Sequence, residues 1–357
     1  MRYVPIGSLD EGMLLARNLY GKDQSLLLGN GQPLKASYIE KIRKLGYSGV
    51  FIKDSVSDDI VIESVISDQL KNYAVIAVKD VFIASSGERG GYEAIERTKE
   101  IVENLIDEIL YNRNLMVNMI DLKVFDDYTF YHSVNVAVLS ILMGVSMYMK
   151  HAALYSLGLG ALLHDIGKIF VGKDILIKDG PLDDAEMADI QKHPSLGYEY
   201  LVNHYDIPAR AYLGALHHQE RYDGTGYPMG LKGERISQIG RIIAIADVYD
   251  ALISDRPYRK ALLPANAMEY IMGGSGTMFD PHFVSVFSSK VAAYPLGTIV
   301  LLSDGSRGIV VKNYEDCCTR PYVRIITGGD EVRESEYVDF RDAPTSARLK
   351  IIDIEKS

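Results

Sequence analysis

Ala161-Leu162-Leu163-His164-Asp165-Ile166-Gly167-Lys168 places a histidine and an aspartate side by side at the end of an apolar helical run. Burying such a pair costs free energy unless both side chains find partners. Neighbouring positions on a helix point about 100° apart, so the two residues can approach a metal cluster from different directions, with the carboxylate bridging two ions. Taken alone, the pair is as consistent with a structural role as with a metal site.

Other side chains of ligand type stand at similar places in the same region of the chain. His217-His218 repeats the pairing, and His193-Pro194 opens a helix with proline in its first turn. Asp247 stands where a core helix would otherwise have leucine, and His132, which alone would be read as structural, begins one face of a helix. Five imidazoles and two carboxylates suit a pair of divalent ions such as Fe, Mn, Co, Ni or Zn.

Such a pair of ions points to phosphoryl chemistry. Two ions about 3.5–4 Å apart can hold a hydroxide between them and stabilise both oxygens of an in-line phosphoryl displacement. The chain has eight histidines. The three that show no partner pattern are interpreted as surface or packing residues: His151, His204 and His282.

The overall charge and the cysteines restrict the other classes of function. The formal net charge is -10, which argues against long nucleic acids, because their binding needs Lys and Arg to neutralise phosphates. It does not exclude a small anionic substrate, since local cations or metal ions can outweigh the global charge. Cys317 and Cys318 are adjacent and too few for a disulfide framework, which indicates a reducing, cytoplasmic environment.

No segment reads as a secretion signal or a membrane span. Residues 1–5 lack a charged segment followed by an apolar one. The longest apolar stretch, Val134–Met149, is interrupted by Asn135, Ser140 and Ser146 and is short for a span. It predicts a buried helix instead.

Changes of pattern divide the chain into four parts, and the predicted fold class is mainly α. Residues 1–60 alternate short β-like runs with glycine turns around one helix, which predicts a small α+β module with an interaction or regulatory role. Residues 61–119 read as a linker and a long helix, and residues 120–292 as a compact helical bundle. Residues 293–357 contain β-branched runs with hairpin signals, which predict a small β-barrel or sheet.

The long helix carries a repeating apolar row. Ile95, Val102, Ile109 and Met116 recur every seven residues. The row favours a helix that packs on the next domain. A homodimer through residues 92–119 is the alternative, which a Thr and an Asn in the second row disfavour.

Four blocks of the helical region carry a family resemblance. They are His164-Asp165-Ile166-Gly167-Lys168; the run from His217-His218 to Gly226-Tyr227-Pro228; Asp247–Leu252 followed by Asp255-Arg256-Pro257-Tyr258-Arg259; and Phe279-Asp280-Pro281. In these blocks, and over residues 128–287 as a whole, the sequence resembles the HD-GYP family, a branch of the HD-domain phosphohydrolases. General HD hydrolases share the first block, whereas the Gly-Tyr-Pro ending and the Asp-Arg-Pro-Tyr-Arg block separate this family from them.

The resemblance implies a helical HD-type bundle that hydrolyses cyclic di-GMP to the linear dinucleotide pGpG, and often on to GMP. The metal ligands that it implies are His132, His164, Asp165, His193, His217, His218 and Asp247. The substrate contacts that it implies are Lys168, Tyr227, Arg256 and Arg259, with His164, Asp165 and Lys168 at the centre of catalysis. We therefore expect two divalent transition-metal ions, Fe or Mn first and Zn, Ni or Co as alternatives, with a metal-bridged hydroxide as the nucleophile.

Two positions depart from the family pattern. Tyr128 stands one helical turn before the first histidine, where some members have a Glu that holds a third metal, so two ions are expected here. Gln219 follows the histidine pair where the family usually has Glu, and Glu220 points about 100° away. A carboxylate there would orient a ligand, so its replacement leaves open a function without turnover. Two other functions stay open beside the phosphodiesterase. One is a cyclic di-GMP binding or signalling module with weak or no turnover. The other is hydrolysis of another nucleotide, such as another cyclic dinucleotide or guanosine tetraphosphate.

Overall fold

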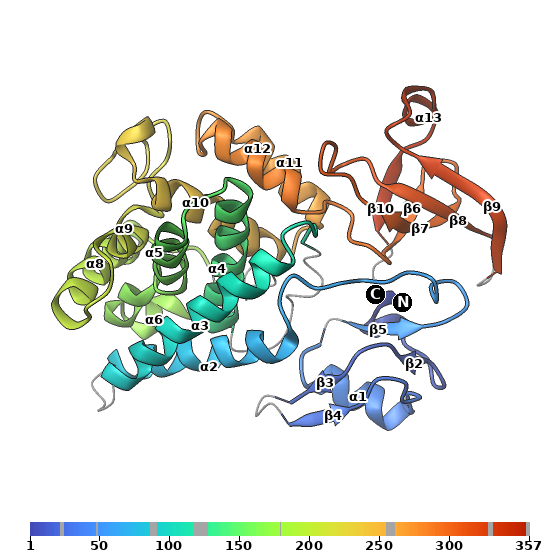
Figure 1. The fold of residues 1–357 in the computed structure, drawn as a ribbon, viewed down its shortest axis with the longest axis horizontal. Coiled ribbons are helices and arrows are strands. Elements are labelled where there is room, and N and C mark those ends of the chain that lie inside the picture. The colour runs from blue at the N-terminus through green and yellow to red at the C-terminus, as the bar shows by residue number, and fades with distance from the viewer. Residues whose placement is uncertain are drawn as a thin grey trace.

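The computed structural model of the protein describes residues 1–21, 25–47, 49–85, 91–117, 128–178, 180–254, 261–327 and 331–354. Helices fill the middle of the chain, and small sheets form near both ends (Figure 1). This confirms the predicted fold class, mainly α with a small α+β part before the helices and a strand-rich part after them.

The middle of the chain forms a helical body around one large apolar core. In it α4 packs against α5 and α10, and α5 packs against α9. Continuous apolar runs explain these contacts, since α5 and α10 bury side chains on most of their faces. The helices are α2 (Asp68–Ser85), α3 (Gly91–Tyr111), α4 (Tyr128–Ser146), α5 (His151–Leu162), α6 (Lys173–Leu176), α7 (Asp184–Ile190), α8 (His193–His204), α9 (Ala209–His217), α10 (Gln238–Ile253), α11 (Pro264–Gly273) and α12 (Pro281–Lys290), with 3₁₀ segments η3 (Ile166–Phe170) and η4 (Gly233–Arg235).

The segment before α4 differs from the prediction of a linker and one long helix. It contains two helices, α2 and α3, which pack against each other and share the core of the helical body. The predicted apolar row lies on α3, where Ile95, Val102 and Ile109 are at most 2% exposed. A row buried within its own chain cannot form a coiled-coil seam, so a homodimer through this row finds no support.

The apolar stretch in α4 is a core helix. Thr129–Ser146 is long and apolar enough to cross a membrane, and it is the one such helix among the residues that the structure places. However, 78% of this window is buried inside the helical body. The prediction of a buried helix from its sequence agrees with this placement.

The N-terminal part is a small α+β module. Its central sheet has the order β1-β5-β2, with β1 antiparallel to β5 so that Arg2 pairs with Ile52 and Pro5 with Gly49. The helix α1 shares an apolar core with this sheet, where Ile42 and Val50 are each 2% exposed. The elements are β1 (Arg2–Pro5), η1 (Ile6–Ser8), β2 (Leu14–Leu15), β3 (Leu19–Tyr20), β4 (Leu26–Leu28), α1 (Ala36–Lys44) and β5 (Gly49–Lys53).

The C-terminal part is a five-stranded antiparallel sheet of order β10-β6-β7-β8-β9. A short helix, α13, precedes the last strand, so this part is not purely β. The elements are β6 (Ile299–Leu302), β7 (Arg307–Lys312), β8 (Tyr322–Thr327), β9 (Glu331–Asp339), α13 (Ala343–Arg348) and β10 (Ile351–Ile354).

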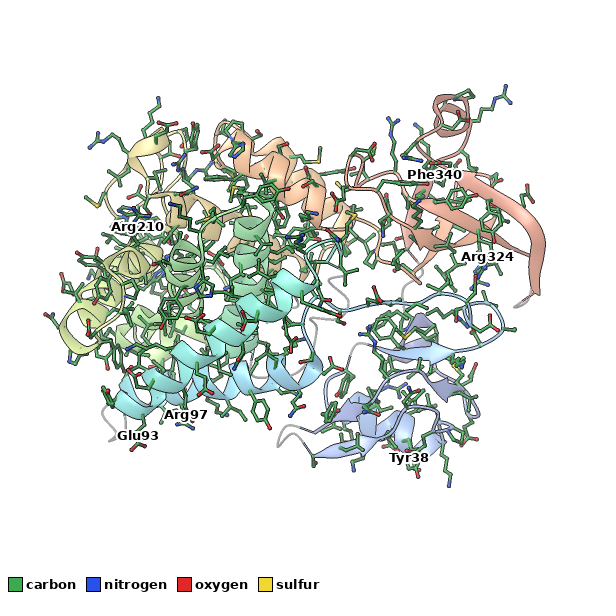
Figure 2. All side chains as sticks on the ribbon, viewed as in Figure 1. Tyr38, Glu93, Arg97, Arg210, Arg324 and Phe340 are labelled. Carbon is green, nitrogen blue, oxygen red and sulfur yellow. The ribbon has the colours of Figure 1, made fainter. Side chains whose placement is uncertain are left out.

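The N-terminal and C-terminal parts meet across a shared apolar cluster. Side chains from β5 and the segment after it pack there with side chains from β6, β7 and β8. Arg324 of β8, labelled in Figure 2, donates to both carboxylate oxygens of Asp59 at 2.7 and 2.9 Å and also bonds to the carbonyl of Val56. Two parts far apart in sequence are thus joined beside the helical body (Figure 1).

Candidate metal centre

Side chains of ligand type from several helices meet at one buried place. His132 lies in α4, His193 begins α8, and Asp247 lies in α10. His164-Asp165 follows the end of α5, and His218 follows the end of α9. All of these side chains are buried, and Asp247 is the most exposed of them at 9%. The centre is therefore assembled from residues that are distant in sequence.

Gly167 allows two of these elements to approach each other. A Cβ atom at this position would lie 2.0 Å from the backbone oxygen of His193, which is closer than side-chain and backbone atoms can come. Without that atom, η3 lies directly on the start of α8. The approach leaves Oδ1 of Asp165 3.5 Å from Nε2 of His193.

Three of the histidines make the same type of hydrogen bond to the backbone. Nδ1 of each lies 2.7–2.8 Å from a backbone carbonyl oxygen three residues earlier: His164 with Ala161, His193 with Ile190, and His218 with Ala215. A carbonyl oxygen only accepts, so Nδ1 carries the proton and donates. The lone pair of Nε2 is then free on each ring, which is the tautomer that metal-binding histidines commonly adopt.

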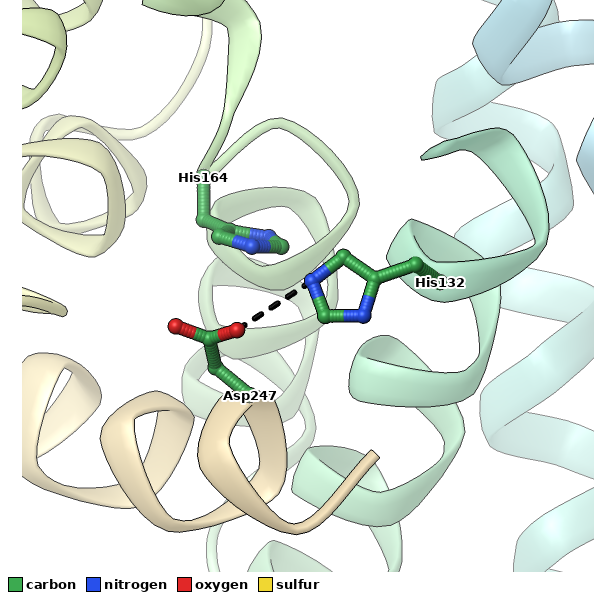
Figure 3. A group of neighbouring side chains, drawn as sticks. All are labelled: His132, His164 and Asp247. Atoms are coloured by element: carbon green, nitrogen blue, oxygen red, sulfur yellow. Dashed lines mark ion pairs between the residues drawn. The ribbon is translucent and has the colours of Figure 1, made fainter. Parts of the chain in front are cut away.

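His132 follows the same rule with a carboxylate in place of a carbonyl. Its Nδ1 lies 2.7 Å from Asp250, which also accepts from Asn135 at 2.8 Å. Its Nε2 faces Asp247 at 3.2 Å, and His164 lies beside them (Figure 3). Burial alone would lower the pKa of His132, but Asp247 and Asp250 outweigh it and raise that pKa to about 9. A metal ion would have to displace this proton.

Asp247 is the carboxylate on the α10 side of the centre. Burial opposes its ionisation, but the hydrogen bond and charge of His132 outweigh burial and hold the pKa of Asp247 below its usual range. Its second oxygen accepts from the Gln219 amide at 3.0 Å. The group is therefore an anion with both oxygens engaged.

Asp165 stands between the histidines. Its Oδ2 lies 3.3 Å from Nε2 of His164, and its Oδ1 lies 3.5 and 3.6 Å from Nε2 of His193 and His218. Lys168 approaches Oδ2 at 2.5 Å. Burial opposes ionisation, but the nearby positive charge of Lys168 outweighs it and holds the pKa of Asp165 well below its usual range. One anionic oxygen thus faces each side of the centre.

The donor set has the chemistry of a cation site. Nε2 of His164 and Oδ1 of Asp165 are buried without a hydrogen-bond partner, and an orphaned buried polar atom is costly. Nε2 of His193 and Nε2 of His218 lie 3.1 Å apart, although both Nδ1 atoms hold the protons. Two sets of donor atoms each lie within 4.8 Å of one another: His132, His164 and Asp247, and His164, Asp165 and His218. Divalent ions would satisfy these nitrogen and oxygen atoms.

His217 is placed differently from the other predicted ligands. Its Nδ1 accepts from the backbone amide of Ser237 at 3.2 Å, so the neutral ring carries its proton on Nε2. Burial lowers its pKa. It belongs to neither of the two donor sets above.

The predicted substrate residues are described only in part. Lys168 pairs with Asp165 and keeps 34% of its side chain exposed. The Tyr227 ring lies 6.4 Å from that of His193, and burial raises the pKa of its hydroxyl. Arg256 and Arg259 lie outside the described residues, and so does the side chain of Tyr128, on which the expectation of two rather than three ions depends.

The histidines predicted to be peripheral lie on the surface. His151 faces Glu103 at 3.0 Å, His204 stacks on Tyr200, and His282 is exposed. None of the three takes part in the donor sets of the centre.

One carboxylate that supports the centre, Asp250, is not identified from the sequence, and a second, Glu220, fixes the neighbouring loop. Asp250 stands one helical turn after Asp247 in an apolar helix, and that spacing was the available signal. Glu220 is 3% exposed and accepts from the backbone amides of Met229 and Leu231 at 2.7 and 2.9 Å. It holds the loop that contains Tyr227 and is not directed at the centre.

The helical region of the chain is similar to known proteins. A family model described as an HD domain matches residues 114–283. A Pseudomonas aeruginosa protein named as a cyclic di-GMP phosphodiesterase is 37% identical over 226 residues, which are 63% of this chain and 54% of the relative. A Vibrio cholerae protein named as a 3'3'-cGAMP-specific phosphodiesterase is 37% identical over 168 residues, 47% of this chain and 36% of the relative. The chain thus spans about half or less of the length of these relatives.

A solved structure supports the fold. A Bdellovibrio bacteriovorus protein described as an HDG"Y"P protein superimposes with a TM-score of 0.51 at 17% identity, covering 80% of this chain and 97% of that one. At this identity the likeness shows a shared fold, and it confirms the predicted HD-type bundle. Residues 114–283 of the chain thus match the family model of an HD domain and share the fold of that solved structure.

Proposed function

We propose that this chain is a metal-dependent phosphodiesterase that hydrolyses cyclic di-GMP to the linear dinucleotide pGpG, with either pGpG or GMP as the end product. One observation carries the proposal. Several imidazoles surround the central carboxylate of Asp165, and each is oriented by a hydrogen bond from its Nδ1 to a backbone carbonyl oxygen. A buried site of this composition suits metal-assisted hydrolysis at phosphorus. The relatives named as cyclic dinucleotide phosphodiesterases support this reaction class.

Two ions, Fe or Mn first, would bind on the two sides of Asp165. His193 and His218 face one of its oxygens, while His132, His164 and Asp247 lie toward the other. When bound, such a pair lowers the pKa of coordinated water toward neutrality and stabilises the oxygens of an in-line displacement. We propose His217 as the seventh ligand only because of its position in the sequence.

The residues of the chain that would bind the substrate are cationic or aromatic. Lys168 stands at the edge of the centre with part of its side chain exposed, from where its ammonium can contact a phosphate oxygen. Arg256 and Arg259 are proposed from sequence to grip phosphate oxygens with their planar guanidinium groups. Tyr227 would contact the substrate from its loop beside His193.

The guanine-containing cyclic dinucleotides are the proposed substrate class, with cyclic di-GMP first. The Pseudomonas relative is named as a cyclic di-GMP phosphodiesterase. The Vibrio relative is named as a 3'3'-cGAMP-specific phosphodiesterase, so 3'3'-cGAMP is the second candidate substrate. We propose that the reaction takes place in the cytoplasm, in keeping with the free thiols of Cys317 and Cys318.

Turnover on a nucleotide panel tests the proposal. The protein is loaded anaerobically with Mn²⁺ or Fe²⁺ and offered cyclic di-GMP, 3'3'-cGAMP and guanosine tetraphosphate, with products separated by chromatography. We expect the fastest loss for cyclic di-GMP, with pGpG as the first product. Binding of cyclic di-GMP by a metal-loaded protein that turns over none of the three would contradict the enzyme and favour a binding module.

A further inference from the structure

Gln219 stands between a candidate metal ligand and the loop that carries Tyr227. Its side-chain Nε2 donates to Oδ2 of Asp247 at 3.0 Å, and its Oε1 accepts from the Tyr227 hydroxyl at 3.1 Å. Its backbone oxygen also accepts from the amide of Tyr227 at 3.2 Å. The side chain and main chain of one residue therefore connect this loop to Asp247.

The chemistry of an amide fits this position. An ionised aspartate only accepts hydrogen bonds, so the group facing Oδ2 of Asp247 must donate. An ionised glutamate at position 219 would have no donor and would bring a second negative charge against Asp247. Glutamine donates from one end and accepts from the other, which satisfies Asp247 and Tyr227 together. The departure from the family pattern thus has a structural use in this chain.

The rest of the loop is fixed from the same segment. The buried carboxylate of Glu220 accepts from the amides of Met229 and Leu231. A Cβ atom on Gly226 would lie 2.3 Å from the backbone nitrogen of Arg221, so the loop folds directly onto the residues that follow the histidine pair. Tyr227 therefore has a fixed place from which its hydroxyl reaches Gln219.

We propose that Gln219 is a positioning residue that orients the Asp247 carboxylate for metal binding and couples it to the Tyr227 loop. The proposal rests on the proposed function only in taking Asp247 as a metal ligand. Partners that orient a metal ligand commonly change metal affinity or activity 10- to 100-fold when they are removed. By thermodynamic linkage, removing the Tyr227 hydroxyl weakens metal binding through the same amide.

Metal titration without substrate tests this role. Metal-free protein is titrated with Mn²⁺, and the visible absorption of the Co²⁺-loaded protein is recorded for wild type, Gln219→Leu and Tyr227→Phe. Gln238→Leu is the matched control, because it removes an exposed amide from the same helix that carries Asp247. We expect Gln219→Leu to lower Mn²⁺ affinity about 10- to 100-fold and to alter the Co²⁺ spectrum. Tyr227→Phe should give a smaller loss in the same direction, and the control no loss.

The outcomes separate this proposal from the proposed function. A folded Gln219→Leu protein with wild-type Mn²⁺ affinity and Co²⁺ spectrum would overturn it, even if wild type hydrolyses cyclic di-GMP. If circular dichroism shows that Gln219→Leu does not fold, Tyr227→Phe decides: unchanged affinity overturns the coupling, and reduced affinity supports it. Gln219-dependent metal binding in a protein that hydrolyses no cyclic dinucleotide would leave the positioning role in place and remove the proposed function.

Discussion

Each imidazole around Asp165 has an acceptor facing its Nδ1. That acceptor keeps a proton on Nδ1, so that Nε2 can bind a metal ion. For His164, His193 and His218 the acceptor is a helical backbone carbonyl, which the chain supplies without a further side chain. His132 depends instead on the side chain of Asp250. A substitution at Asp250 therefore removes support from one ligand while every proposed ligand stays in place.

We predict that Asp250→Asn weakens metal binding. The asparagine amide would confront two donors, the Nδ1–H of His132 and the side-chain amide of Asn135, so at least one of them would lose its acceptor. Mn²⁺ affinity should fall about 10- to 100-fold, as measured by titration of the metal-free protein. Asp174→Asn, which changes an exposed aspartate of α6, is the control. Equal affinities in the two variants would show that Asp250 does not support the centre.

Sequence reasoning found the ligands more readily than their supports. His164-Asp165 and Asp247 interrupt apolar helices, so their residue types alone indicate a polar purpose. Asp250 has its partner 118 residues away, and a carboxylate in a helix is usually a solvated one. The role of Gln219 could not be predicted, because the contact of its amide with Asp247 exists only after α9 and α10 have packed.

At the level of elements, glycines decide how closely the ligand-bearing helices approach. Besides Gly167, a Cβ atom on Gly214 of α9 would lie 2.8 Å from Cα of Gly160 in α5. The two helices therefore meet backbone to backbone just before the ends that carry His164 and His218. Close packing at glycine brings ligands of separate helices into one centre.

We predict that Gly167→Ala disrupts the centre. Its methyl group would collide with the backbone of His193, so η3 must move away from α8 and Asp165 away from His193. Overpacking of this kind costs about 1–3 kcal/mol, visible as a lower denaturant midpoint, and it should also reduce metal content. Gly172→Ala is the matched control, because its Cβ would meet only ordinary contacts at 3.6 Å and its φ of -54° suits alanine. Equal loss in both variants would contradict this account.

The sequence predicted the face of α3 correctly but missed α2. Ile95, Val102 and Ile109 form a single row at a regular spacing, which identifies a packed helix face. α2 buries a single face, but apolar Tyr73, Ile76 and Ile83 are exposed outside that face, so its sequence shows no clear apolar period.

For the whole molecule, the main finding is that the N-terminal and C-terminal parts share one apolar cluster. Composition changes predicted two separate small modules, and nothing in their local patterns shows that Phe51 and Ile62 pack with Ile299 and Ile309. Such contacts join segments more than 200 residues apart and follow from the tertiary arrangement. The N-terminal and C-terminal parts are therefore expected to depend on each other for stability.

We predict that Arg324→Ala weakens the contact between the N-terminal and C-terminal parts without abolishing catalysis. Arg324 is 7% exposed, and its guanidinium bonds to Asp59 and to the carbonyl of Val56, so its removal leaves that carbonyl without this donor. The free energy of unfolding should fall by about 1–3 kcal/mol, measured from the denaturant midpoint. Arg320→Ala, at an exposed arginine, should change it by less than about 0.5 kcal/mol. An unchanged midpoint in Arg324→Ala would contradict the coupling of the two parts.

Turnover of cyclic di-GMP by Asp165→Asn, measured beside its metal content and circular dichroism, tests the central claim most directly. Asparagine keeps the size of the side chain but removes the negative charge that faces both sides of the centre. We predict a folded protein with fewer bound ions than the wild type, which should hold about two per chain. Its turnover should be at least about a hundredfold lower. A folded Asp165→Asn protein that hydrolyses cyclic di-GMP at the wild-type rate would contradict metal-dependent catalysis at this centre.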